Sequence, residues 1–166
     1  MIINRAYLLL GGNRGDRLSN IDRAISRLSS LSETEPEISS VFESEPWGFE
    51  SDLKFLNLAA IITTKLDAES LLTKLLETEK ELGRVRSIST ESYSSREMDI
   101  DIIFFNNDII DKEKLTIPHP RMHLRRFVLE PLNEIAAQYI HPVLNKSIKE
   151  LLDECPDRSP VVQLTI

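Results

Sequence analysis

The chain has 166 residues, of which 41% are hydrophobic, enough to bury one continuous core, so we expect a single domain over residues 1–166. Twenty Lys and Arg residues against 27 Asp and Glu residues give a net charge of −7, which disfavours binding to nucleic acid or to an anionic membrane. The one cysteine, Cys155, excludes an intramolecular disulfide and a Cys-rich zinc site, and it fits a cytoplasmic protein. The apolar run Tyr7–Leu10 is too short for a signal peptide or a membrane span.

The first half of the chain predicts one helix and three strands. A buried strand is expected at Ala6–Leu10, followed by a helix that Asp16 caps. Residues 38–43 alternate as a half-exposed strand does, and residues 44–54 form a loop before the buried strand Phe55–Thr64. The apolar stripe of the helix consists of Leu18, Ile21, Ile25, Leu28 and Leu31.

A second helix and a fourth strand follow. Asp67 is placed to cap the helix, and Gly83 is placed to end it in a left-handed conformation. Met98–Phe105 then predicts a strand, residues 106–108 a turn into a short segment at 109–110, and Ser147–Leu152 a terminal helix. The inward face of the second helix consists of Leu71, Leu72, Leu75, Leu76 and Leu82.

The order strand, helix, strand, strand, helix, strand is that of the ferredoxin-like split βαβ unit. We therefore predict an α+β fold in which two helices pack on one face of an antiparallel sheet. This fold supports many functions, so function has to be argued from particular residues.

Two aspartates interrupt the fourth predicted strand. Asp99 and Asp101 stand two residues apart, so both carboxylates leave the same face, ~7 Å apart. Carboxylates at this separation can share hard divalent cations together with phosphate oxygens and water. The alternative is a solvated edge strand, which for an isolated Asp-x-Asp is equally compatible with the sequence.

Cationic side chains gather around this strand in an otherwise acidic chain. Arginine presents a planar fork of donors that matches phosphate oxygens, so the cluster predicts a triphosphate clamp, although each arginine alone also fits a solvated surface. His119, between two prolines, is expected either to donate to a phosphate or to make a structural hydrogen bond. The arginines are Arg84, Arg86, Arg96, Arg121, Arg125 and Arg126.

Two other features are less specific. The segment Leu10–Gly15 follows a strand and opens a helix, but it lacks the spacing of a phosphate-binding glycine loop, so we interpret it as a tight turn. Several residues could line a pocket for an aromatic ligand, with core packing as the alternative for each aromatic. These residues are Trp47, Gly48, Phe55, Asn57 and Phe127.

From its first strand to about residue 145, the chain resembles the 6-hydroxymethyl-7,8-dihydropterin pyrophosphokinase family. Leu10-Gly11-Gly12-Asn13 is similar to that family's Leu-Gly-Ser-Asn turn, and Phe55-Leu56-Asn57 to its Tyr/Phe-Leu-Asn strand start. Each match alone is weak, but the ordered series is specific. The remaining matches are Ser44-Glu45-Pro46-Trp47-Gly48, Glu79-x-x-Leu82-Gly83-Arg84-x-Arg86, Arg96-Glu97-Met98-Asp99-Ile100-Asp101 and Leu115-Thr116-Ile117-Pro118-His119-Pro120-Arg121-Met122.

The resemblance implies transfer of the terminal diphosphate of ATP to the pterin hydroxymethyl group, a step of folate synthesis. Asp99 and Asp101 would hold two Mg²⁺ ions, and Arg86 and Arg96 would act with them in catalysis. The resemblance also places ATP against Glu79, Arg86, Arg96, Lys114, Thr116, His119 and Arg125. It places the pterin against Ser44, Glu45, Trp47, Phe55, Asn57 and Phe127.

The sequence departs from the family pattern at three places. Residues 87–95 contain neither the arginine nor the tryptophan common there, Glu45 replaces a frequent proline, and Lys114 replaces a frequent arginine. We expect a monomer whose partners are ATP and the hydroxymethyl-dihydropterin. A ligand-binding regulatory domain and an Asp-x-Asp phosphohydrolase or nucleotidyl transferase are the alternatives, which the product formed from ATP distinguishes.

Overall fold

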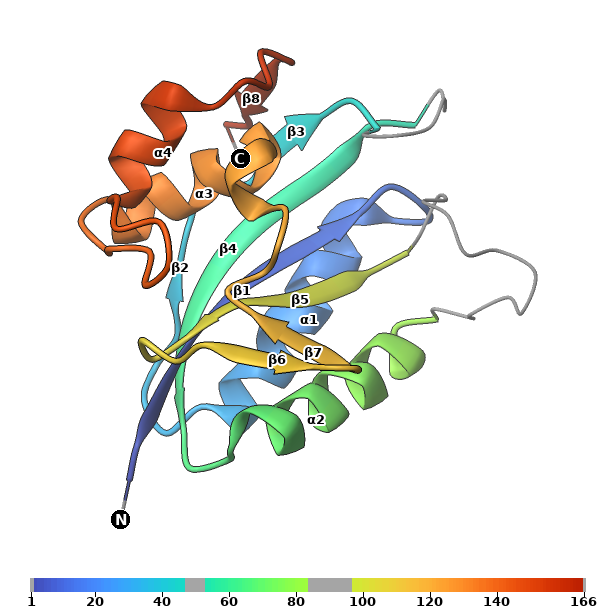
Figure 1. The fold of residues 1–166 in the computed structure, drawn as a ribbon. Coiled ribbons are helices and arrows are strands. Elements are labelled where there is room, and N and C mark those ends of the chain that lie inside the picture. Colours follow the sequence, from blue (N-terminus) through green and yellow to red (C-terminus); the bar gives the residue numbers. More distant parts are fainter. Residues whose placement is uncertain (1, 47–52, 84–96, 166) are drawn as a thin grey trace.

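Antiparallel pairing organises the centre of the molecule (Figure 1). The structure is a computed structural model that describes residues 2–46, 53–83 and 97–165. Within these residues six strands form one sheet in the order β5-β1-β4-β3-β8, with β2 also paired to β4, and every pair is antiparallel. The strands are β1 (Asn4–Gly12), β2 (Glu37–Ile38), β3 (Phe42–Ser44), β4 (Phe55–Thr64), β5 (Asp99–Phe105) and β8 (Val161–Gln163).

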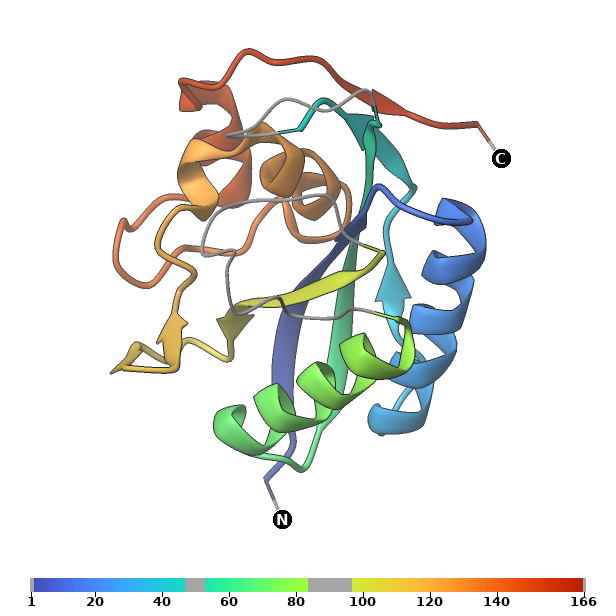
Figure 2. The ribbon, with the colours of Figure 1, turned by 90° about the vertical axis from the view of Figure 1, so that its right-hand side faces the viewer.

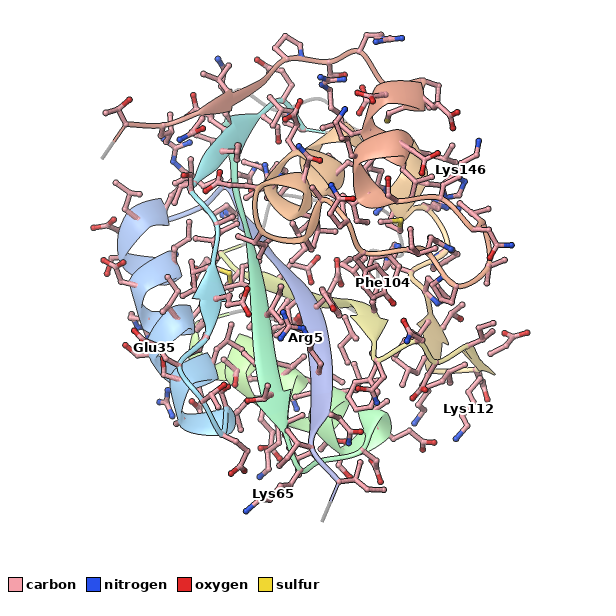
Figure 3. The ribbon with its side chains drawn as sticks, turned by 90° about the vertical axis from the view of Figure 1, so that its left-hand side faces the viewer. Arg5, Glu35, Lys65, Phe104, Lys112 and Lys146 are labelled. Carbon is pink, nitrogen blue, oxygen red and sulfur yellow. The ribbon has the colours of Figure 1, made fainter. Side chains whose placement is uncertain are left out.

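Helices cover both faces of this sheet (Figure 2). Side chains of alternate residues point to opposite faces of a strand, so β1, β4 and β5 contribute to two separate cores. One core packs against α1 (Arg17–Leu31) and α2 (Ala68–Glu81). The other packs against α3 (Arg126–Ala136) and α4 (Ile148–Glu154), and Figure 3 shows Phe104 on this second face.

The predicted helix ends are confirmed. Asp16 accepts a hydrogen bond from the backbone N–H of Ser19 at 3.1 Å, and Asp67 accepts one from that of Ser70 at 2.8 Å. Each carboxylate thereby satisfies an N–H group that has no partner inside its helix. Gly83 follows α2 with a φ of 97°, a backbone conformation that glycine adopts without steric cost.

The continuous strand predicted over residues 38–43 is divided into β2 and β3. At the division, the Ser39 hydroxyl accepts from the backbone N–H of Ala59 at 2.9 Å, while the Ser39 N–H donates to the carbonyl of Ala59. A side-chain oxygen therefore replaces a backbone acceptor in the ladder. Beside it, Glu134 of α3 accepts from the backbone N–H and the hydroxyl of Ser40, both at 2.8 Å.

The predicted ferredoxin-like arrangement is confirmed, with an additional layer. Strands β5, β1, β4 and β2/β3 with helices α1 and α2 reproduce the split βαβ unit. Helix α3 was not expected, and with α4 it covers the opposite face. A small hairpin of β6 (Ile110–Lys112) and β7 (Leu115–Ile117) lies beside β5. Among the described residues, none of the helices has the length and apolar composition needed to cross a bilayer.

Candidate functional site

Three residues lie in one row across the sheet. Asp99 of β5 is paired with Gly11 of β1, and Gly11 is paired with Asn57 of β4. Directly paired residues of antiparallel strands project to the same face. That face is the one covered by α3, because Leu9, Ala59 and other residues of the same alternation belong to its core. Polar groups from two segments far apart in sequence therefore meet on one surface of the sheet.

The two aspartates lie on this face as predicted. Asp99 and Asp101 are half-buried, while Ile100 and Ile102 between and after them are buried in the core beneath α1 and α2. Strand alternation then directs both carboxylates to the α3 side. The donors are two hard carboxylate groups, which suit Mg²⁺ with phosphate and water oxygens completing its coordination. Among the described residues, no group of three or more His, Cys, Asp or Glu side chains is placed to hold a metal ion without such additional ligands.

Glu79 of α2 fixes the strand between these aspartates. Its carboxylate is buried, and Oε1 accepts the backbone N–H of Ile100 at 3.0 Å. Among the described residues β5 is a terminal strand of the sheet, so one side of its backbone has no strand partner there. The structure thus places Glu79, predicted to contact ATP, against the backbone that carries Asp99 and Asp101.

His119 is brought beside the aspartates by a bulge in β5. The pairing passes from Tyr7 with Phe104 to Leu8 with Ile102, which leaves Ile103 as an extra residue. The carbonyl of Ile103 accepts the backbone N–H of His119 at 3.0 Å. Burial lowers the pKa of His119 more than the nearby Asp99 carboxylate raises it, so the ring is neutral at pH 7.

The N-terminus of α3 supplies a cation and an aromatic ring. Arg125 is 5% exposed, and burial lowers the pKa of its guanidinium, which nevertheless stays charged. This guanidinium lies 6.0 Å from the centre of the Phe127 ring, within the range of a cation–π contact. Because α3 packs on β3 and β4, both residues lie over the same half of the sheet as Asn57.

Asn57 is held by a buried hydrogen bond. Its Nδ2 donates to the Ser44 hydroxyl at 2.8 Å, and both side chains are buried. Ser44 of β3 is paired with Phe55 of β4, so the two predicted pterin-binding segments are neighbours. An added Cβ on Gly11 would lie 3.3 Å from Asn57 Oδ1, so glycine at this position leaves the amide undisturbed.

The other predicted site residues lie at the surface or outside the described part of the chain. Glu45 is exposed and pairs with Lys54 at 3.5 Å. Lys114 is exposed in the turn between β6 and β7, and Thr116 is exposed on β7. The predicted positions outside the described residues are Trp47, Gly48, Arg84, Arg86, Arg96 and the segment 87–95.

Asn13, which the sequence placed only in the turn motif, and Arg17, which it did not single out, anchor the segment before β4. Asn13 is buried, and its Nδ2 donates to the carbonyl of Leu53 at 3.0 Å. Arg17 donates to the carbonyl of Lys54 at 2.9 Å and to Glu43 at 3.0 Å. An asparagine directly after two glycines in a turn was the available signal, since such a side chain commonly bonds to nearby backbone.

Comparison with known protein families shows to which family the chain belongs. The family model described as 7,8-dihydro-6-hydroxymethylpterin-pyrophosphokinase (HPPK) matches residues 7–137. The chain belongs to the HPPK family. The assignment predicted from the ordered motifs is therefore confirmed.

Curated relatives agree with this HPPK assignment. A protein of Aquifex aeolicus (strain VF5) named 2-amino-4-hydroxy-6-hydroxymethyldihydropteridine pyrophosphokinase is 41% identical over 89% of this chain and 90% of its own length. One with the same name from Bacillus subtilis (strain 168) is also 41% identical, over 81% of this chain and 80% of its own.

A solved structure supports the HPPK fold. The crystal structure described as HPPK-DHPS in complex with substrates aligns with 93% of this chain at a TM-score of 0.72 and 15% identity. At this identity the likeness concerns the fold alone. The chain spans 43% of that longer chain.

Proposed function

We propose that this HPPK-family chain transfers the terminal diphosphate of ATP to the hydroxyl group of 6-hydroxymethyl-7,8-dihydropterin, giving AMP and the pterin diphosphate in folate synthesis. The observation that carries the proposal is the row Asp99, Gly11, Asn57. It sets Asp99, one of the two aspartates, and the buried Asn57 amide on one face of the sheet, on either side of Gly11. Such a row can hold a metal-bound triphosphate next to a heterocyclic acceptor.

The nucleotide half of the site is built around β5. Asp99 and Asp101 would hold two Mg²⁺ ions together with ATP, and the ions, when bound, offset phosphate charge and orient the phosphate oxygens. His119 and Arg125 lie on the same side of the sheet and would donate to phosphate oxygens. The other ATP contacts that we propose are Glu79, Arg86, Arg96, Lys114 and Thr116, of which Arg86 and Arg96 would also act in catalysis.

The pterin half is built around β3, β4 and α3. Phe55 and Phe127 would stack on the two faces of the ring, since aromatic rings gain both buried area and favourable geometry in this way. The Asn57 amide, anchored by Ser44, would pair with donors and acceptors on the pterin edge. Glu45 and Trp47 would complete this side of the pocket.

The chemistry needs no nucleophile from the protein. The pterin hydroxymethyl oxygen forms a bond to the β-phosphorus of ATP, the bond from that phosphorus to the α–β bridging oxygen breaks, and AMP leaves. The hydroxyl proton is released to water. The rate would therefore come from positioning the two substrates and from cations around the transferred group.

The experiment is to incubate the chain with ATP, Mg²⁺ and 6-hydroxymethyl-7,8-dihydropterin and to identify both products. We expect AMP and the pterin diphosphate in equal amounts, with AMP formation dependent on the pterin. ADP as the stoichiometric product, or ATP hydrolysis independent of the pterin, would contradict the proposal.

We also propose that the chain acts as a cytoplasmic monomer with a single domain over residues 1–166. The buried Cys155, a free thiol, fits a reducing compartment. Light scattering of the purified chain tests the monomer: a mass near 19.0 kDa is expected, and twice that mass would contradict it.

A further inference from the structure

The segment 157–164, here called the C-terminal strap, lies beyond the residues 7–137 that the family model matches. It follows α4 and runs along the sheet to β3 (Figure 2). Its strand β8 pairs with β3, so that Val161 lies opposite Ser44 and Gln163 opposite Phe42. The backbone N–H of Leu164 donates to the carbonyl of Val41 at 2.8 Å. One end of the strap is therefore fixed to the strand that carries Ser44.

The other end of the strap is fixed to the N-terminus of α3. Arg125, the residue that precedes this helix, makes no side-chain capping hydrogen bond. Instead Asp157 Oδ2 accepts the backbone N–H of Arg126 at 3.1 Å. A carboxylate at this position satisfies a free N–H group and interacts favourably with the positive end of the helix dipole.

Asp157 is suited to this role in charge and in geometry. Burial raises the pKa of Asp157, but hydrogen bonds from Ser159 and Arg126 outweigh it and hold the pKa below its ordinary value. The side chain is therefore ionised at neutral pH. Its second oxygen, Oδ1, accepts the N–H of Ser159 at 2.9 Å, which fixes the carboxylate.

The two ends of the strap border the two sides of the proposed pterin pocket. At β3, Ser44 bonds to Asn57 and is paired with Phe55. At α3, Arg126 lies between Arg125 and Phe127 in the sequence. Helix α3 also contacts β8 and β3 directly. The strap thus connects α3, which carries Phe127, to β3, which lies beside Phe55 of β4.

We propose that the C-terminal strap is a positioning element for pterin binding: by capping α3 through Asp157 and pairing with β3, it fixes Phe127 relative to Phe55 and Asn57. The inference rests on the proposed function, because it assigns the strap to the acceptor half of that site. Of the proposed ATP contacts, Arg125 adjoins the capped residue Arg126, whereas Asp99 and Asp101 lie on β5, at the opposite end of the sheet order from β8. Loss of the strap should therefore affect the pterin more than the nucleotide.

The test uses calorimetry to measure two affinities of each variant. The first is the affinity for 6-hydroxymethyl-7,8-dihydropterin in the presence of Mg²⁺ and the unreactive analogue α,β-methylene ATP. The second is the affinity for the analogue alone. Asp157→Ala removes the acceptor of Arg126 and should weaken pterin binding about 5-fold, the effect of one hydrogen bond. Asp157→Asn keeps an acceptor oxygen and should restore most of the affinity. Affinity for the analogue should fall less than affinity for the pterin in both variants, because the proposed nucleotide half is built mainly around β5.

A second variant acts at the other end of the strap. Leu164→Pro removes the N–H that donates to Val41 and should also weaken pterin binding selectively. Two controls match these changes: Asp153→Ala breaks an exposed ion pair of α4 with Lys149, and Thr165→Pro places proline one residue beyond that bond. Both should bind the pterin as wild type does.

Wild-type pterin affinity in folded Asp157→Ala and Leu164→Pro would overturn the inference, as would equal losses of pterin and nucleotide affinity. If Asp157→Ala does not fold, Leu164→Pro decides the question alone. Failure of the proposed function looks different: the wild-type chain would then form no AMP from ATP and the pterin.

Discussion

Gly11 separates the two kinds of polar group in the site. It lies between Asp99 and Asn57 in the sheet, and neighbouring strands are about 4.8 Å apart, so these two residues stand about 10 Å apart across it. Any side chain at position 11 would occupy the space between them and approach Asn57 Oδ1. The missing side chain thus keeps open the path along which the acceptor hydroxyl would meet the phosphate.

Asp99→Asn and Asp101→Asn should each slow diphosphate transfer roughly 100-fold or more, the scale seen when a group that stabilises transition-state charge is lost. Asparagine keeps the shape of the side chain but loses the charge that attracts Mg²⁺. The pterin affinity should stay unchanged. The rate of single-turnover transfer, measured at saturating ATP across a Mg²⁺ titration, shows the effect. Wild-type rates in both variants would contradict the assignment of the metal site to Asp99 and Asp101.

Asn57→Ala should weaken pterin binding by ~1 kcal/mol or more, since it removes a pairing amide and leaves the buried Ser44 hydroxyl without its donor. Phe127→Ala should weaken it by a similar amount through loss of a stacking face. Equilibrium titration with the pterin measures both changes. Unchanged affinity in both folded variants would place the pocket elsewhere.

Glu79 links helix α2 to the strand that carries the two aspartates. The carboxylate reaches from α2 to the Ile100 N–H, which lies between the two aspartates in sequence. Glu79→Ala leaves that N–H without this acceptor and should destabilise the fold by about 1–3 kcal/mol. Glu79→Gln keeps an acceptor oxygen and should recover part of the loss. Urea unfolding measures both, and a Glu79→Ala variant as stable as wild type would contradict this role.

The elements that could be predicted from the sequence are those defined by contacts between residues close together in the chain. Asp16, Asp67 and Gly83 act within a few residues of their own helices, so sequence patterns reveal them. At the division between β2 and β3, Ser39 bonds to Ala59 and Ser40 bonds to Glu134, far along the chain. The apolar alternation of residues 38–43 gives no sign of either contact. Helix α3 contains Pro131, which is unfavourable inside a helix and obscured the pattern.

The same distinction applies to the candidate site. Asp99 and Asp101 share a strand, so their common face could be predicted from spacing alone. The resemblance supplied Asn57, but its position in the row with Gly11 and Asp99 depends on strand order. Asp157 could not have been found, since its partner Arg126 belongs to a helix that the sequence pattern did not predict.

At the scale of the whole molecule, His141 makes stability depend on pH. Its buried ring accepts the backbone N–H groups of Val143 and Leu144 through Nδ1, at 3.1 and 3.0 Å, and packs edge-on against Phe104. Burial, and then the nearby His123, lower the pKa of His141 below its ordinary value of 6.5. Protonation at Nδ1 would remove the acceptor of both bonds.

The free energy of unfolding should therefore fall as the pH is lowered below about 6.5, where unfolded histidine binds a proton and the folded chain does not. His119, whose pKa is also lowered, acts in the same direction. His141→Phe removes one of the two groups and should flatten the dependence between pH 7.5 and 5.5 without abolishing it. Urea unfolding at both pH values measures the difference, and an identical slope in wild type and variant would contradict the assignment.

The pairing of β8 with β3 also sets an order of events while the chain is being synthesised. Strands β1, β4 and β5 can pair once residue 105 has left the ribosome, so the surface that carries Asp99 and Asp101 can form early. The free edge of β3, with Ser44, finds its partner only after residue 163 has been made. A nascent chain thus completes the aspartate side of its sheet while the opposite border is still open to pairing with another polypeptide.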